Sequence, residues 1–203
     1  MTEAGLARDL TERLRGRPLP EDLVALVTLQ AGTDPDAHPA DHPLALTETW
    51  LLSPVEHGAL LEQDYLTDSD RANPDIMANV VAINEVLGHG AWVVRTFNGD
   101  VAGYWLHPEE PADRPAAIVR YDTEGVFTVL PGRTLVEALI YNMAHEDDDE
   151  IAALAAAFTA YGLPVNPSRS EDLPDPIVAV DPVELHHRRY YAERAARGLP
   201  EIF

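Results

Sequence analysis

Apolar residues between positions 91 and 130 fall into four short runs, each bounded by turn-forming residues. The runs are Ala91–Phe97, Asp100–Leu106, Ala117–Asp122 and Val126–Leu130. They are rich in valine and aromatic side chains, which favour strands. The pattern predicts an antiparallel sheet built from two hairpins.

The residues between the runs specify how the strands connect. Asn98-Gly99 is the strongest short hairpin signal in the chain, and a type I′ turn there needs positive φ at both residues. Thr123-Glu124-Gly125 joins the second pair of runs. The segment 107–115 contains three prolines, so it is expected to be a loop rather than a central strand.

Three helices are predicted before the sheet. The first is Pro20–Gly32, in which Leu23, Leu26 and Val27 form the apolar stripe; a proline-punctuated loop over 33–43 follows. Leu44–Leu52 is expected to be a strand or extended. Ser53-Pro54-Val55-Glu56 is a capping box that opens the second helix, and the third runs from Asn73 to about Gly88.

Helical signals also follow the sheet. Thr134-Leu135-Val136-Glu137 is a capping box for a helix that ends near Met143. An alanine-rich helix stopped by Gly162, a proline-rich connector and a last helix from Asp181 to Gly198 complete the chain. We therefore expect a body over 17–145 and a helical C-terminal extension over 146–203, packed on the body as one domain overall.

The composition narrows the possible compartments and chemistries. The 203 residues include no cysteine, so disulfide frameworks and thiol chemistry are excluded. All 14 basic residues are arginine, which together with abundant alanine and proline is typical of a GC-rich bacterial genome. No apolar run approaches the roughly 20 residues of a membrane span, and charges interrupt the N-terminal segment. The expected location is cytoplasmic.

The charge distribution indicates what kind of partner the chain attracts. Residues 18–187 hold 30 acidic side chains and six arginines, and the whole chain has a net charge of −21. Such a field repels nucleic acids and anionic membranes, because both are bound through clustered basic residues. It attracts a basic protein and speeds the encounter at low salt. The simpler interpretation is that the acidity maintains solubility.

Several segments, taken in order, resemble the SUKH superfamily, which is named partly for yeast cell-wall-synthesis regulators and includes bacterial toxin-immunity domains. They are Leu19-Pro20-Glu21-Asp22-Leu23, Trp50-Leu51-Leu52-Ser53-Pro54, Phe97-Asn98-Gly99-Asp100 with Tyr104-Trp105, and Val119–Glu124 with Phe127–Leu130. The resemblance covers residues 17–145; the C-terminal extension and a helical insert near 64–88 depart from the pattern. It implies an α+β fold with a single curved antiparallel sheet packed by N- and C-terminal helices. It also implies binding of another protein, often a toxin, without catalysis.

Candidate sites for other chemistry are weak. The acidic run 146–150 lacks the glycine-bent spacing of a calcium loop and is better explained as a helix start or a protein contact. His186 and His187 are adjacent, so on a helix they diverge by about 100° and cannot easily chelate one ion. Their basic, aromatic helix is expected to dock on the acidic body or lie exposed; homomeric or nucleic-acid contact are the alternatives. Gly88-His89-Gly90 is interpreted as a structural turn rather than a catalytic histidine.

The function predicted from the sequence is a non-enzymatic protein-binding module, with an immunity protein that neutralises a cognate toxin as its specific form. The alternatives are an intracellular regulatory or scaffold protein with an endogenous partner and, less favoured, a hydrolase that uses paired carboxylates such as Glu109 and Glu110. No cofactor and no metal are expected, and the partner is expected to be basic. The oligomeric state is left open. The predicted partner-binding residues are Glu109, Glu110, Asp113, Tyr104, Trp105, Asp147 and Asp148.

Overall fold

Five strands form one antiparallel sheet in the computed structural model, which describes residues 3–30, 42–60, 62, 65–163 and 165–201. The strands are β1 (Thr49–Leu51), β2 (Gly90–Thr96), β3 (Val101–Trp105), β4 (Ile118–Tyr121) and β5 (Phe127–Leu130). Their order is β1-β2-β3-β4-β5, so each strand pairs with the next one along the chain. The predicted α+β class with a single antiparallel sheet, flanked by N- and C-terminal helices, is confirmed.

The described helices surround this sheet. They are α1 (Glu3–Arg13), α2 (Glu21–Gln30), α3 (Pro43–Leu46), α4 (Pro54–Ala59), α5 (Asp68–Ala72), α6 (Pro74–Leu87), α7 (Leu135–Ala144), α8 (Asp148–Ala160) and α9 (Pro182–Ala196). Within the described part of the chain, none is both long and apolar enough to cross a membrane.

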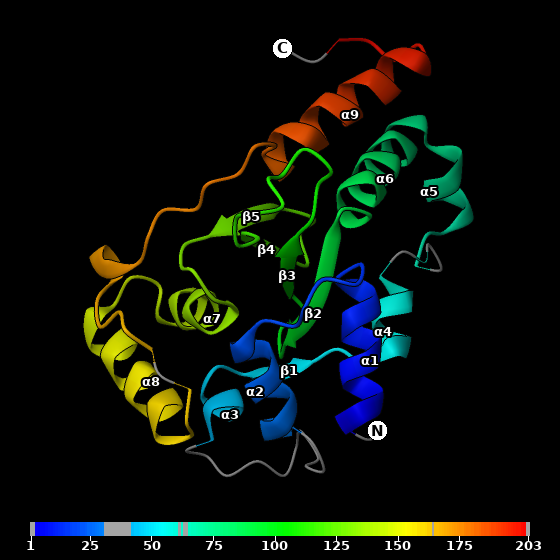
Figure 1. The fold of residues 1–203 in the computed structure, drawn as a ribbon. Coiled ribbons are helices and arrows are strands. Elements are labelled where there is room, and N and C mark those ends of the chain that lie inside the picture. Colours follow the sequence, from blue (N-terminus) through cyan, green and yellow to red (C-terminus); the bar gives the residue numbers. More distant parts are fainter. Residues whose placement is uncertain (1–2, 31–41, 61, 63–64, 164, 202–203) are drawn as a thin grey trace.

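The sheet lies between two helical layers (Figure 1). Alternate side chains of each strand point to opposite faces, so one strand contributes to the core on both sides. In β3, Ala102 and Tyr104 face a core built with α1, α2, α7 and α8. Val101 and Trp105 face a second core, which α6 and α9 cover. Both faces of the sheet are therefore buried.

The strand β2 contains a β-bulge where it pairs with β3. Trp92 pairs with Gly103 and Val94 pairs with Ala102, which leaves Val93 as the extra residue. A Cβ atom at position 103 would lie 2.1 Å from the carbonyl oxygen of Ala91, so the two strands approach too closely for any residue but glycine.

Both predicted hairpins form, but their turns have three residues. At the first hairpin, Thr96 N–H donates to the carbonyl of Asp100, and Gly99 N–H donates to the carbonyl of Thr96. Gly99 has a φ of 96°, whereas Asn98 does not have positive φ. The prediction of a type I′ turn at Asn98-Gly99 was therefore wrong: a type I turn followed by a left-handed glycine closes the hairpin. Gly125, with a φ of 86°, closes the second hairpin in the same way.

The C-terminal segment lies against the rest of the chain through both helices. Phe158 of α8 is fully buried in the first core, and Leu185 of α9 is buried in the second. Asp75 at the start of α6 accepts a hydrogen bond of 2.8 Å from the Tyr190 hydroxyl and pairs with the guanidinium of Arg194. The hydrogen bond from Tyr190 helps to hold the pKa of Asp75 below its ordinary value.

Several helix boundaries were predicted correctly. The capping box at Ser53 and Glu56 is present, and α6 begins with Asn73 as its N-cap. Thr134 caps α7 as expected, but the Glu137 carboxylate accepts from Arg133 N–H instead of Thr134 N–H, so that capping box is only half formed.

Two regions differ from the sequence-based expectation. The beginning of the extended segment Leu44–Leu52 belongs to the short helix α3, because His42 accepts from Leu44 N–H and Pro43 suits a first helical position. The helix α1, which was not predicted, uses Leu6 and Leu10 to join the first core. The helix stop expected at Gly32 and most of the loop over 33–43 fall outside the described residues.

Candidate functional site

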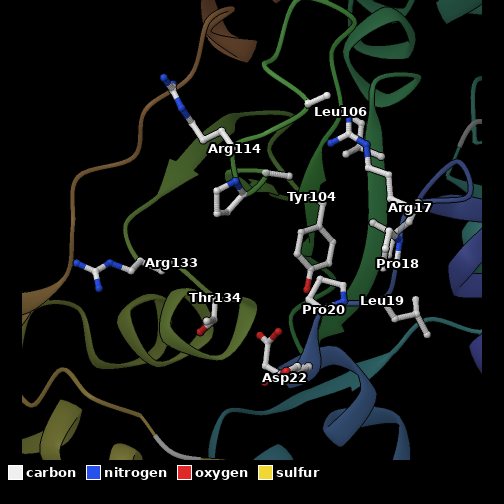
Figure 2. A pocket seen from close by; sticks show the side chains of 15 residues that line it. Arg17, Pro18, Leu19, Pro20, Asp22, Tyr104, Leu106, Arg114, Arg133 and Thr134 are labelled. Atoms are coloured by element: carbon white, nitrogen blue, oxygen red, sulfur yellow. The ribbon is translucent and has the colours of Figure 1, made fainter.

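A pocket of about 650 Å³ opens between the starts of α2 and α7, the end of β3 and the loop after it (Figure 2). A volume of this size is typical of small-molecule sites. Apolar side chains and prolines make up most of the wall. The lining residues are Leu14, Arg17, Pro18, Leu19, Pro20, Glu21, Asp22, Tyr104, Leu106, Ala112, Arg114, Pro115, Ala116, Arg133 and Thr134.

Tyr104 projects from β3 into this pocket. Its side chain is only 4% exposed, and its hydroxyl has no hydrogen-bond partner among the described residues. In Figure 2 the hydroxyl is directed toward the start of α2, on the side of Pro20 and Asp22. Burial raises the pKa of this hydroxyl well above its ordinary value, and the charge of Asp22 adds to the shift. Tyr104 therefore offers an unused, neutral hydroxyl to the pocket.

Asp22 connects the two helices that form one side of the pocket. It lies in the first turn of α2, and its Oδ2 accepts a hydrogen bond of 3.2 Å from Val136 N–H in the first turn of α7. Burial raises the pKa of this carboxyl, while the backbone hydrogen bonds from α7 act in the opposite direction. The carboxyl thus supplies the anion that the positive end of α7 favours.

Three arginines surround the mouth of the pocket. Arg17 is half-buried, and Arg114 and Arg133 are exposed. Figure 2 places Arg17 on one side, beside Leu106, and the other two on the opposite side with their guanidinium groups turned outward. None of the three makes a side-chain hydrogen bond or ion pair with the described part of the chain. Three guanidinium groups without an ion-pair partner among the described residues thus lie around this opening.

A second feature is the segment that links α8 to α9, which two predicted carboxylates hold in place. Glu110, in the loop after β3, accepts hydrogen bonds from the backbone N–H groups of Ala179 and Val180. Asp148, at the start of α8, accepts from the N–H and hydroxyl of Ser170 at 2.9 and 3.2 Å. Residues 107–113, 146–150 and 165–181 therefore form one continuous region, here called the acidic connector surface.

This surface is strongly charged and contains one large exposed apolar side chain. Its segments hold twelve acidic residues and a single arginine, Arg169, which pairs with Glu171 at 3.1 Å. Ile177 is 65% exposed in the middle of the connector. Arg114 and Arg133 border the surface on the side of the pocket. Ile177 is one of several large apolar side chains that the described residues expose, and here it lies among carboxylates.

The structure places the seven predicted partner-binding residues in three kinds of position. Glu109 and Asp113 are exposed on the loop, with no side-chain partner among the described residues. Glu110 and Asp148 hold the connector, and Asp147 caps α8 by accepting from Glu150 N–H at 3.1 Å.

Tyr104 and Trp105 occupy the third kind of position, because neither reaches the outer surface. Trp105 is completely buried, and its indole N–H donates to the carbonyl of Val180 at 2.9 Å. Trp105 is therefore not accessible at the surface, as a partner-binding residue would have to be. Tyr104 faces the pocket instead.

The residues that sequence reasoning missed gave weak signals. Ile177 begins a short apolar run, Ile177–Val180, that carries no signal of exposure. The three pocket arginines come from three separate loops, and only the fold brings them together. Asp22 lies in the first turn of α2, where a carboxylate is favoured in any case, so the sequence gives no sign of its contact with α7.

The other candidate groups have structural partners. His89 packs against His107, with ring centroids 4.5 Å apart, and burial lowers the pKa of His89. On α9, His186 lies 2.9 Å from the side-chain oxygen of Asn79. Within the described ranges, no three histidine or carboxylate side chains are grouped as metal ligands would be.

Comparison with known proteins returns no match to a family model, to a curated protein or to a solved structure. The SUKH resemblance therefore stays a prediction from the sequence.

Proposed function

We propose that this chain is a non-enzymatic protein-binding module that engages a basic partner through the acidic connector surface. The observation that carries this proposal is the way the surface is built: acidic residues tie the connector to the body, and other carboxylates and Ile177 remain exposed. The carboxylates thus have a structural role and leave a charged face available.

The backbone that carries the free groups on this face is held in place before a partner arrives. Glu109 and Asp113 lie on the loop that Glu110 anchors, and Asp175 is exposed on the connector itself. The carbonyl of Pro174 also accepts from Gly132 N–H at 3.1 Å, which fixes the backbone beside Asp175. Because the backbone is already ordered, less conformational entropy is lost when a partner binds.

The chemistry of the face defines the partner. Carboxylates that lack a basic partner attract a protein with clustered arginines or lysines, which increases the rate of association at low salt. The exposed Ile177 supplies apolar area at the centre, where desolvated contacts contribute most of the affinity. A basic toxin that acts on an anionic substrate has such a surface, and covering that surface would neutralise it. In its specific form the chain is then an immunity protein of the cytoplasm.

The biological role is tested by competition between sibling cells. A strain that lacks this gene is complemented with the wild type, with the triple variant Glu109→Gln, Asp113→Asn and Asp175→Asn, or with a control variant. The control, Glu12→Gln, Glu62→Gln and Glu124→Gln, removes three exposed carboxylates outside the acidic connector surface and changes the net charge equally.

We expect parental cells to outcompete the deletion strain and the triple variant, but not the wild-type or control complements. If the deletion strain competes equally with its parent, the immunity role is wrong. An equal rescue by both variants would instead show that the acidic connector surface is not the contact.

A further inference from the structure

The pocket between α2, α7 and β3 collects charge that the proposed function does not use. Five arginines in the described chain have no side-chain hydrogen bond, ion pair or ring contact: Arg8, Arg17, Arg114, Arg133 and Arg188. Three of these five line one pocket. In a chain with a net charge of −21, arginines are expected to find carboxylates, and seven of the fourteen form ion pairs with other described residues. The three partnerless arginines at the pocket opening are therefore suited to bind an anion that is not part of the chain.

The interior of the pocket provides a second, independent indication of a ligand. The Tyr104 hydroxyl is buried and has no partner, although burying a hydroxyl without a hydrogen bond is costly. In Figure 2 it points toward Pro20 and Asp22, which line the same pocket. A ligand with an amide or hydroxyl group at this depth would supply the missing hydrogen bond.

The positive end of α7 does not serve as the anion site. Asp22 already accepts from Val136 N–H, and the Thr134 hydroxyl accepts from Glu137 N–H. An anionic group on the ligand would therefore be held at the mouth by the arginines. Their exposed side chains change rotamer within nanoseconds, so the outward guanidinium groups of Arg114 and Arg133 can turn toward it.

The size and charge of the pocket define the class of ligand. The lining contains three arginines and two acidic residues, Glu21 and Asp22, which leaves one net positive formal charge. That charge matches a ligand with a single negative charge. A phosphate monoester carries about −1.5 to −2 charges at pH 7 and would be only partly neutralised. A carboxylate carries one charge and matches the planar guanidinium group. The walls of leucine, proline and alanine suit an apolar body.

We propose that this pocket binds a small carboxylic acid with an apolar body and an internal amide or hydroxyl group, the chemistry of an N-acyl amino acid. The apolar body lies against Leu14, Pro18 and Leu106. The internal polar group reaches the Tyr104 hydroxyl, and the carboxylate lies between Arg17 and the arginines across the mouth.

The test is isothermal titration calorimetry with N-hexanoyl-glycine, N-hexanoyl-L-leucine and N-hexanoyl-L-phenylalanine, each beside its carboxamide. The carboxamides keep the body and the amide but lose the charge. We expect at least one acid to bind with a Kd below about 1 mM, and its carboxamide to bind at least about tenfold more weakly. Absence of binding for all three acids, or equal binding of acid and carboxamide, overturns the proposal.

Variants locate the binding within the pocket. The double variant Arg114→Gln and Arg133→Gln should weaken binding of the acid about tenfold, whereas Arg8→Gln with Arg188→Gln, a matched pair of partnerless arginines outside the pocket, should leave it unchanged. Tyr104→Phe should keep the fold and weaken binding several-fold, because only a partnerless hydroxyl is removed. Equal losses in both arginine pairs would show that the attraction is a general charge effect and would overturn the assignment to this pocket.

Discussion

The carboxylate of Glu110 accepts hydrogen bonds from the backbone N–H of Ala179 at 2.8 and 3.0 Å, although 69 residues separate the two in the sequence. The contact joins the loop after β3 to the segment that leads into α9. An acidic residue expected to meet a partner thus builds the surface on which neighbouring carboxylates are displayed.

Replacing Glu110 with glutamine should loosen the connector without unfolding the body. The variant keeps a side-chain oxygen but loses the charge and one acceptor, so we expect a loss of about 1–2 kcal/mol in the free energy of unfolding. Hydrogen exchange at Ala179 and Val180 should become faster. Glu109→Gln, at the exposed neighbouring position, should change the stability by less than about 0.5 kcal/mol. Equal effects of the two changes would show that the contact does not hold the connector.

Local signals explain why much of the fold could be predicted. The hairpin glycines, Gly99 and Gly125, and the cap residues Ser53 and Thr134 act within a few residues of their own position. Short stretches of sequence are therefore enough to predict these turns and caps. The turn at Asn98 was predicted in the right place but with the wrong type, because two- and three-residue hairpin loops share the same asparagine–glycine pair.

Long-range contacts explain what the sequence could not reveal. Trp105 was predicted to contact a partner, yet its indole N–H donates to the carbonyl of Val180, 75 residues away. The exposure of Ile177 depends on how the connector lies against the body, which its own stretch of sequence does not specify. The pocket needs Asp22 and Tyr104 at one place, and no local pattern relates the two. Each of these outcomes depends on tertiary packing.

The close approach of β2 and β3 predicts a severe effect at Gly103. Gly103→Ala would place a methyl group 2.1 Å from the carbonyl oxygen of Ala91, so the strands must separate, and we expect a loss of more than about 3 kcal/mol or failure to fold. Gly58→Ala is the matched control, because it lies within α4 with open space around it. That change should increase the stability by up to about 1 kcal/mol. Chemical denaturation measures both, and a tolerated Gly103→Ala would contradict the bulge geometry.

Asp22 predicts how the stability of the fold responds to pH. Burial raises the pKa of this carboxyl above the value of about 3.9 that applies to the unfolded chain. Between these two values the folded protein binds more protons than the unfolded protein, so the contribution of Asp22 to stability falls as pH rises through this interval. Asparagine cannot ionise and still accepts from Val136 N–H.

The prediction is therefore a change in relative stability with pH. The free energy of unfolding of Asp22→Asn, relative to the wild type, should increase from pH 4 to pH 7. Urea denaturation at both pH values measures this difference. A constant difference, or one that decreases with pH, would show that burial does not dominate the environment of this carboxyl.

Binding of a basic protein by the acidic connector surface is tested by a comparative pull-down. Wild type, the triple variant Glu109→Gln, Asp113→Asn and Asp175→Asn, and the control Glu12→Gln, Glu62→Gln and Glu124→Gln are immobilised. Lysate from the source cells is applied at about 50 mM and about 300 mM salt, because screening weakens charge attraction at the higher value.

Bound proteins are quantified by mass spectrometry. We expect one basic protein that the wild type and the control retain at low salt, with weaker retention at high salt and little on the triple variant. Equal retention by the triple variant, or no basic protein on the wild type, would contradict it.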